Sequence, residues 1–294
     1  MLKVVLKKAY KLIPFKKALY RLLKRSFGTP PLRVYQHLYF FGEFEVRFDS
    51  TKTFKLQHYG YPIENEIFWK GLYGGWEKES LKLWSRFCRD AQVIVDVGAN
   101  TGIYSLVAKT VNPAAKVFAL EPIQRVYQKL LHNIRINNFD IVAIDKAASN
   151  KNGKAIIYDI PAEHQYSATL TLRHHTAQAN TVPTEIETVT LASFAAAHQL
   201  NNIDLIKIDA ERHEAEVLEG FLPLLHSYRT TFLIEIIDSE VAAKIQNYFA
   251  DKPYLYFNID ETHGYSKVDT IEKSNGFNYL FCTEEKAKAM GLIP

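Results

Sequence analysis

The pattern of hydrophobic and polar positions predicts strands and helices that alternate along most of the chain. Residues 93–97 (Val-Ile-Val-Asp-Val) form an apolar, largely β-branched run, which is typical of a strand buried on both faces. The run breaks at Gly98, Asn100 and Gly102, and residues 103–111 then have helical spacing. The same reasoning predicts strands at 117–120, 141–144, 203–209 and 232–237, and helices at 127–138, 217–225 and 239–249. This alternation favours an α/β fold, a mostly parallel sheet with helices on both faces.

Shorter patterns predict additional elements around this sheet. Two closing strands are predicted at 254–257 and 279–282, added strands at 154–158 and 185–189, and a pair of short strands within 44–56. The polar stretch 161–183 is interpreted as a surface loop, and contact with an acceptor is the alternative for its histidines, His164, His174 and His175.

The N-terminal residues 1–30 resemble a basic amphipathic helix that Pro14 interrupts. Basic residues break every apolar run within 2–25, which excludes a spanning helix and a signal peptide. Two interpretations fit: residues 1–25 dock on an anionic membrane surface, or the helix packs on the domain. Residues 31–85 are predicted to be a cap or lid segment. The aromatic-rich part of this segment, 63–84, forms either a wall of the acceptor site or ordinary hydrophobic core. Residues 86–294 are predicted to form the catalytic domain.

Charge is distributed unevenly along the chain. The net charge is +4, but residues 1–33 hold ten Lys and Arg and no acidic residue, so 26 basic and 32 acidic residues remain in the rest. An acidic body does not support nucleic-acid binding. Two distant cysteines, Cys88 and Cys282, give no disulfide framework. We therefore expect a cytoplasmic protein, peripheral on the inner face of the membrane if the N-terminal helix docks there.

The glycine-bearing turn after residue 97 carries the first candidate chemistry. Gly98 and Gly102 fit the outer glycines of an acidic-x-Gly-x-Gly-x-Gly turn, and Asn100, which tolerates left-handed φ, replaces the middle one. The spacing is not that of a dinucleotide site. The turn suits S-adenosylmethionine (SAM), because the Asp96 carboxylate before it can accept hydrogen bonds from the ammonium group of SAM. The turn residues Gly98, Ala99, Asn100, Thr101 and Gly102 are therefore candidate cofactor residues.

A second acidic residue strengthens the SAM hypothesis. Glu121 ends the strand at 117–120, about 20 residues after the turn, where its carboxylate can accept both ribose hydroxyls. Pro122 follows with its φ preset for a helix start. Adenine is expected beside Ala147, in the stretch 145–149 that follows the strand at 141–144.

Several ordered stretches together resemble the FkbM-type family of SAM-dependent, class I methyltransferases, over roughly residues 67–282. They are 96–102 (Asp-Val-Gly-Ala-Asn-Thr-Gly), 120–122, 133–137, 147–150 with Gly153, 206–211, 217–220 and 234–236. The resemblance implies a Rossmann-like, seven-stranded sheet with six parallel strands and an antiparallel seventh. It also implies methylation of a hydroxyl on a sugar, glycolipid, polysaccharide or natural product. Two residues depart from the family pattern: Arg212 where Gly is usual, and Ala192 where Asp is usual. Arg212 adds positive charge near the expected acceptor mouth, which suggests an anionic or divergent acceptor, or lost activity.

Removal of the acceptor proton requires a general base. Asp209, at the end of the strand at 203–209, is the first candidate, followed by Glu211, His213 and Glu235. The alternative for Glu211, His213 and Glu214 is ordinary helix-start polarity. A divalent ion held by Asp209, Glu211 and Glu235 is a weaker alternative, and no metal is expected. Two other functions stay open at this point: an NAD-dependent oxidoreductase, and a protein that binds SAM without turnover.

Overall fold

The structure, a computed structural model, describes residues 15–159, 168–169 and 182–294. Its contacts divide the chain into two compact units, Met1–Lys78 and Glu79–Pro294. The start of the predicted N-terminal helix, including Pro14, lies outside the described residues. So do the three histidines of the predicted loop at 161–183. Among the described residues, no helix is both long and apolar enough to cross a lipid bilayer.

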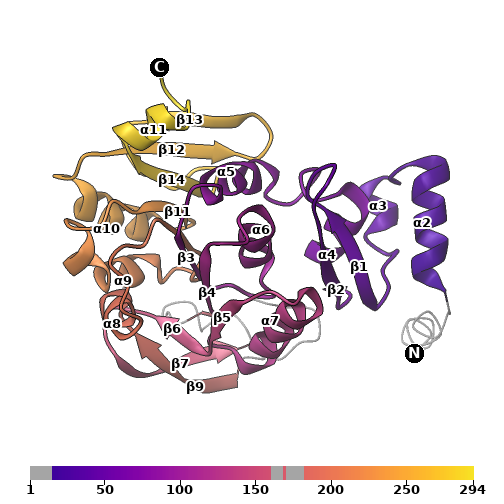
Figure 1. Cartoon of the computed structure of the whole chain (residues 1–294), viewed down its shortest axis with the longest axis horizontal. Helices are drawn as coiled ribbons and strands as arrows, with labels where there is room; N and C mark the ends of the chain where they lie inside the picture. The colour runs from indigo at the N-terminus through magenta and orange to yellow at the C-terminus, as the bar shows by residue number, and fades with distance from the viewer. Residues whose placement is uncertain (1–14, 160–167, 170–181) are drawn as a thin grey trace. The chain divides into compact units, whose positions relative to one another are not determined.

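The smaller unit is built on a β-hairpin and three helices (Figure 1). These are α2 (Lys16–Phe27), α3 (Leu32–Tyr35), β1 (Gly42–Arg47), β2 (Thr53–His58) and α4 (Pro62–Lys70). The hairpin was predicted, and Asp49 closes its turn by accepting hydrogen bonds from the backbone N–H groups of Thr51 and Lys52, both at 2.7 Å. The buried side chains of both strands include Phe44 and Leu56, on the face that packs toward Phe68.

Eight strands form the main sheet of the larger unit, in the order β13-β12-β14-β11-β10-β3-β4-β5. Their bounds are β3 (Val93–Val97), β4 (Lys116–Leu120), β5 (Ile141–Ile144), β10 (Leu205–Ile208), β11 (Thr231–Glu235), β12 (Tyr254–Asp260), β13 (Gly264–Val268) and β14 (Asn278–Thr283). The strands from β11 to β5 are parallel, and β14 runs antiparallel to both β11 and β12. Six strands therefore share one direction with one antiparallel strand between them, as expected, and β13 adds an unpredicted eighth at the edge.

The strand order positions a ligand site. From β3 the chain moves outward to β4 and β5, whereas β10 and β11 lie on the other side of β3. The order therefore reverses between β3 and β10. In open α/β sheets, ligands bind at such a reversal, outside the carboxyl ends of the strands.

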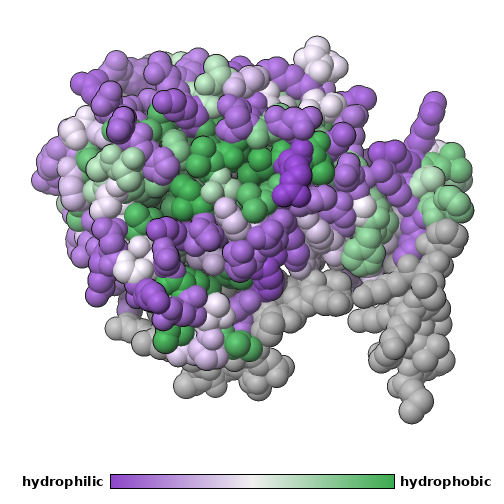
Figure 2. Space-filling view, turned by 60° about the horizontal axis from the view of Figure 1, so that its bottom comes forward, coloured by the Kyte–Doolittle hydropathy of each residue, from purple (hydrophilic) through white to green (hydrophobic). Residues whose placement is uncertain are grey.

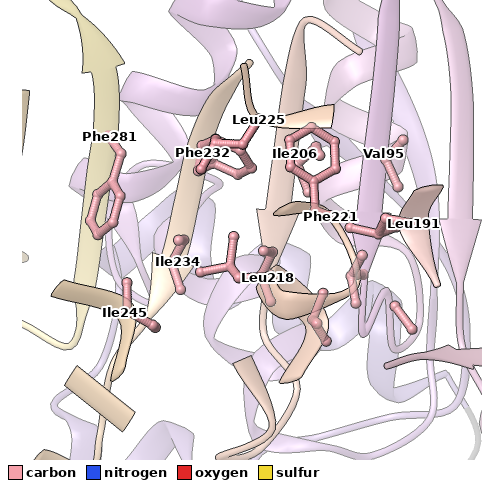
Figure 3. Packing of buried hydrophobic residues seen from close by; sticks show 14 of the residues in the cluster. Val95, Leu191, Ile206, Leu218, Phe221, Leu225, Phe232, Ile234, Ile245 and Phe281 are labelled. Atoms are coloured by element: carbon pink, nitrogen blue, oxygen red, sulfur yellow. The ribbon is translucent and has the colours of Figure 1, made fainter. Parts of the chain in front are cut away.

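Helices cover both faces of this sheet, as predicted (Figure 1). They are α5 (Lys78–Cys88), α6 (Ile103–Val111), α7 (Gln124–Asn137), α8 (Leu191–Ala197), α9 (Glu214–Glu219), the 3₁₀ helix η2 (Leu222–Leu224), α10 (Ser239–Phe249) and the C-terminal α11 (Glu284–Ala289). On one face, Ile206, Phe232 and Ile234 pack against Phe221 and Ile245 in a continuous hydrophobic core (Figure 3). Burying each such side chain contributes about 1.5–3 kcal/mol relative to leaving it exposed, so this core holds the carboxyl ends of the strands in place.

The first helix of the larger unit is fastened to the turn between β12 and β13. The carboxylate of Glu261 accepts hydrogen bonds from the backbone N–H groups of Glu79 (2.6 Å) and Ser80 (3.2 Å), and from the Ser80 hydroxyl (2.5 Å). It thereby satisfies N–H groups in the first turn of α5 that have no partner within the helix.

A second sheet lies beside the carboxyl ends of the main sheet. It consists of β6 (Lys146–Ala148), β7 (Gly153–Asp159), β8 (Ala168–Thr169) and β9 (Val182–Val189), in the order β6-β9-β7-β8. The predicted added strands correspond to β7 and β9. A small core formed by Ile123, Val126, Ala147, Ile157 and Ile186 joins this sheet to the start of α7.

Several predicted elements have other bounds in the structure, and two of the differences have a clear description. The helix predicted at 217–225 ends at Glu219, and a 3₁₀ turn follows, because Pro223 has no N–H to continue the α-helical ladder. The strand predicted at 203–209 is shortened to Leu205–Ile208. In the aromatic stretch 63–84, Phe68, Trp69 and Trp84 are at most 6% exposed, so they are core residues of their own units.

Candidate functional site

A cavity opens at the reversal between β3 and β10, as the strand order predicts. Its empty volume, including the part open to solvent, is about 680 Å³. The lining residues follow the ends of β3, β4, β5 and β10: Val97, Gly98, Asn100, Leu120, Glu121, Pro122, Ile123, Lys146, Ala147, Ala148, Ile157, Asp209, Ala210 and Glu211. All of them belong to the larger unit.

The turn between β3 and α6 approaches the loop after β10 very closely. Gly98 has φ +74°, and a Cβ there would lie 1.8 Å from the carbonyl oxygen of Asp209. Only glycine fits this position. Asn100 has φ +52°, which confirms that it takes the left-handed conformation of the missing middle glycine. Its buried Oδ1 atom has no hydrogen-bond partner among the described residues.

Glu121 connects two loops at the cavity wall. Its Oε2 accepts from the Asn100 N–H (3.0 Å) and its Oε1 from the Ile123 N–H (2.9 Å). A carboxylate offers about four lone-pair directions, so each oxygen can still accept one more hydrogen bond from a ligand. Burial raises the pKa of Glu121 to about 7, although the two backbone N–H groups lower it in part.

Asp96 does not line the cavity. Its Oδ2 accepts hydrogen bonds from the Ser105 N–H (3.0 Å) and the Ser105 hydroxyl (2.6 Å), so it anchors the first turn of α6. Burial raises its pKa, which the positive charge of Lys207 opposes. The predicted contact of Asp96 with the cofactor ammonium group thus stays a prediction.

Three other predicted cofactor residues shape the turn from behind the cavity wall. The Ala99 N–H donates to the Leu120 carbonyl (2.9 Å), and the Thr101 carbonyl accepts from the Asn133 amide (2.8 Å). Gly102, with φ +93°, is the N-cap of α6. The structure therefore brings Gly98, Asn100, Glu121, Pro122 and Ala147 together at the cavity, and places these three in its supporting turn.

Two of the four predicted catalytic residues, Asp209 and Glu211, line the cavity. The Asp209 Oδ2 is 2.9 Å from the Nζ of Lys207, whose side chain is 3% exposed and whose Nζ also lies 4.5 Å from the centroid of the Tyr104 ring. Burial, and then the negative charge of Asp209, raise the pKa of Glu211 to about 7. Glu211 has φ +51°, an unusual backbone conformation that often marks functional sites.

The other two candidates do not line the cavity. His213 is hydrogen-bonded through Nε2 to the Ser149 hydroxyl (2.9 Å), and burial lowers its pKa. Glu235 is the last residue of β11.

The sequence reasoning missed Lys207 as a site residue and gave Glu214 only a helix-start role. Lys207 stands in a strand whose other residues are apolar, and a lysine in such a run was the available signal. Glu214 is the first residue of α9, and its Oε1 also accepts from the N–H groups of Ala210 and Arg212, both at 3.0 Å. Its Oε2 is buried without a hydrogen-bond partner in the described part of the chain, and burial raises the pKa of Glu214 to about 8. Glu214 therefore holds the loop that carries Glu211.

The structure explains why glycine suits position 212. Arg212 has φ +76°, directly after Glu211 at +51°, so two successive non-glycine residues are left-handed. Such a conformation costs an ordinary residue roughly 1–2 kcal/mol, which glycine avoids. The Arg212 Nη1 lies 3.7 Å from the Asp238 Oδ2.

Comparison with known proteins identifies the family. The family model described as "Methyltransferase FkbM domain" matches residues 96–272, more than half of the chain. No curated protein is significantly similar to this chain in sequence. The match decides against the NAD-dependent alternative and explains why the ordered stretches occur together.

Solved structures give weaker similarities. A methyltransferase FkbM from Methylobacillus flagellatus is 14% identical, with a TM-score of 0.44, over 66% of this chain and 44% of that one. The present chain thus spans less than half the length of that protein. A Bacillus cereus O-methyltransferase, solved in complex with SAH, is 12% identical, with a TM-score of 0.40, over 70% of this chain and 80% of that one.

Proposed function

Because this chain belongs to the FkbM family of class I methyltransferases and uses SAM as its cofactor, we propose that it methylates a hydroxyl oxygen of its acceptor. The acceptor class comprises sugars, polysaccharides, glycolipids and natural products. The observation that carries the proposal is a pair of carboxyl groups on the wall of one cavity, the buried Glu121 and the half-buried Glu211. One is suited to hold the cofactor and the other to take the acceptor proton.

The residues of the cavity fit SAM. Each Glu121 oxygen has a lone pair left for a ribose hydroxyl, and the Asn100 Oδ1 is a buried acceptor that needs a donor. The absence of a side chain at Gly98 lets the turn pack directly against the Asp209 carbonyl, which brings the loops after β3 and β10 together at the cavity. When bound, SAM supplies a methyl group on a positively charged sulfur.

Glu211 is the proposed general base. As the acceptor oxygen bonds to the methyl carbon, its proton must leave, and a carboxylate within hydrogen-bond reach can take it. A pKa of about 7 lies close to a neutral working pH, which is the most effective range for a base. Asp209, which came first on the sequence pattern alone, is paired with Lys207, so we assign it to positioning the loop.

Turnover of Glu211→Gln tests this assignment. We expect its kcat to fall about 100-fold or more, as for other lost general bases, with the Kd for SAM within about threefold of wild type. Asp209→Asn should lose less, and Glu185→Gln, at an exposed position, serves as the control. If Asp209→Asn loses more activity than Glu211→Gln, Asp209 is the base. If SAM binds but no S-adenosylhomocysteine forms with any sugar or host extract, the chain is a binding protein.

The pH profile gives a second test of the same base. Because Glu211 must be ionised to accept a proton, kcat/KM should rise with pH and level off above about 7. Glu211→Gln should remove this rise. A wild-type profile that is flat between pH 5.5 and 8 contradicts the assignment. Mass spectrometry of host glycans and lipids, with and without the protein, would then identify the acceptor as a species heavier by one methylene.

We also propose that the basic N-terminal region docks on an anionic bilayer, at the inner face of the membrane. On α2, the exposed Leu19 (50%) and Leu22 (61%) lie beside the exposed Arg21 and Arg25. Phe15, just before the helix, is 83% exposed. In Figure 2, hydrophobic and hydrophilic residues lie next to each other on the surface of the smaller unit. Apolar residues flanked by basic ones are the pattern that binds anionic lipid surfaces.

Vesicle co-sedimentation of the full chain tests the docking. Leu19→Glu combined with Leu22→Glu should abolish binding to vesicles that contain phosphatidylserine. Val142→Glu, at an exposed position on β5, should bind like wild type. The membrane role is rejected if the Leu19/Leu22 double variant binds phosphatidylserine vesicles as well as Val142→Glu does. It is also rejected if the wild type binds neutral vesicles as well as anionic ones.

A further inference from the structure

A second pocket lies beside the cofactor cavity, in the larger unit. It is lined by Arg212, Ile237, Lys273, Ser274, Asn275 and Phe277, with an empty volume of about 880 Å³ including the part open to solvent. Glu211 lines the cofactor cavity and Arg212 lines the second pocket. Because the two residues are consecutive, their Cα atoms are about 3.8 Å apart, and the two sites are neighbours. A molecule in the second pocket can therefore extend toward Glu211.

The pocket is at the carboxyl edge of the sheet, where an acceptor must approach the cofactor. Ile237 follows the end of β11, and Arg212 belongs to the loop after β10. The Ile236 N–H donates to the Phe277 carbonyl (2.7 Å), which fixes the segment before β14 against the end of β11.

The loop that carries the polar residues is held in place from behind. The Asn258 amide donates to the Gly276 carbonyl (2.6 Å) and to the Ser274 hydroxyl (2.9 Å). A Cβ at Gly276 would lie 2.3 Å from the Ile259 carbonyl oxygen, so the loop also packs tightly on β12. Its residues thus form a prearranged surface, which lowers the cost of binding a ligand.

The lining residues indicate the chemistry of the ligand. Arg212 and Lys273 are cations and Asn275 supplies an amide, and all three are donors for oxyanions. The Ser274 hydroxyl instead donates to the Gly276 carbonyl (2.7 Å) and so helps to hold the loop. Two acidic groups lie near Arg212: the Asp238 Oδ2 is 3.7 Å from its Nη1, and its positive charge also acts on Glu211. Phe277 is 48% exposed, an apolar surface that can cover the apolar face of a sugar ring.

From this arrangement we propose that the second pocket binds an anionic sugar, one that carries a carboxylate or a phosphate, as the methyl acceptor. This inference rests on the proposed function and adds the charge of the acceptor to it. Arg212 and Lys273 hold the anionic group, Phe277 lies against the ring, and the hydroxyl to be methylated points toward Glu211. The arginine that departs from the family pattern then sets acceptor specificity.

Binding of defined sugars to the full chain, saturated with S-adenosylhomocysteine, tests the proposal. The probes are methyl glucuronide, glucose 6-phosphate and neutral methyl glucoside, measured by calorimetry or ligand-observed NMR. We expect at least one anionic probe to bind about tenfold tighter than the neutral one, since only an anion can form charge-assisted hydrogen bonds with Arg212 and Lys273. The two anionic probes distinguish carboxylate from phosphate.

Variants separate this inference from its alternatives. Arg212→Ala combined with Lys273→Ala should remove the preference for the anionic probe, and Phe277→Ala should weaken all three. Lys116→Ala, at the amino end of β4, is the matched control and should keep the preference. Equal binding of neutral and anionic sugars, no anionic binding at millimolar concentration, or a preference that survives the double variant overturns the proposal. Methyl transfer to a neutral sugar would reject only this inference, whereas failure of transfer to any hydroxyl rejects the proposed function.

Discussion

The two pockets at the carboxyl edge of the main sheet have opposite charge. Glu121, Asp209 and Glu211 line the cofactor cavity, whereas Arg212 and Lys273 line its neighbour. Acidic groups suit ligands that donate hydrogen bonds or carry positive charge, and basic groups suit anions. The boundary between them is one peptide, between two left-handed residues. A single turn with two left-handed residues thus separates the acidic cavity from the basic pocket.

The largest effect is expected where the backbone of the cofactor cavity has no room. Gly98→Ala places a Cβ 1.8 Å from the Asp209 carbonyl oxygen, so the two loops must separate. We expect a loss of about 3 kcal/mol or more in the free energy of unfolding, and SAM binding too weak to measure by calorimetry. Gly264→Ala is the control: its φ is +99° and nothing lies within 4 Å, so about 1–2 kcal/mol should be lost and SAM should still bind.

Glu121→Gln tests the acidic character of the cofactor cavity. An amide has only one acceptor oxygen, so the Kd for SAM should rise about tenfold, the cost of a lost charge-assisted hydrogen bond. In the wild type the ionised form binds better, so affinity should fall as the pH drops below the Glu121 pKa of about 7. The variant should lack this dependence. An unchanged Kd in Glu121→Gln would remove Glu121 from the ribose site.

Comparing Arg212→Gly with Arg212→Ala distinguishes the effect of the backbone conformation at this position from the effect of the positive charge. Both should reduce binding of the anionic sugar about tenfold and leave SAM binding unchanged. Only the glycine variant relieves the left-handed φ of +76°, so it should be more stable than the alanine variant by up to about 1 kcal/mol in urea unfolding. If the two variants are equally stable, the conformation at 212 carries no strain.

The last prediction concerns Glu214, which holds the loop that carries Glu211. Its folded-state pKa of about 8 lies above the ordinary 4.5, so its contribution to stability is complete below pH 4.5 and is lost as the pH rises through about 8. Glu214→Gln stays neutral, so its stability relative to wild type should increase between pH 5 and 8.5 by more than about 1 kcal/mol, since each pKa unit between 4.5 and 8 corresponds to about 1.4 kcal/mol. Exposed Glu187→Gln should show no such trend. Parallel stability curves would contradict a buried, protonated Glu214.

The cofactor half of the fold could be predicted from sequence because its signals are local. The bounds of β3, β5, α6 and α10 are those predicted, since continuous apolar runs and a capping residue such as Asp238 define them. The strand β13 was missed because its Gly-Tyr-Ser-Lys-Val sequence is largely exposed and has no apolar run. The shorter β10 was missed because Asp204 uses its side chain to accept from the N–H groups of Gln92 and Val93, contacts between distant residues.

The candidate site was predictable in part for the same reason. Spacing identified Gly98, Asn100 and Glu121, and the structure places all three at the cavity. Spacing could not show that Asp96 turns toward Ser105, or that Lys207 pairs with Asp209, since both depend on side-chain direction within a buried strand. The basic pocket was indicated only by Arg212, because Lys273 and Phe277 lie about sixty residues later and meet it through the pairing of β11 with β14.

The contact of Glu261 with the start of α5 has a consequence for how the chain is made. Glu79 and Ser80 leave the ribosome 182 and 181 residues before the side chain that satisfies their N–H groups. The first helix of the larger unit can therefore reach its final state only after nearly all of that unit has been synthesised. Truncation before the turn between β12 and β13 should leave the first turn of α5 without these hydrogen bonds.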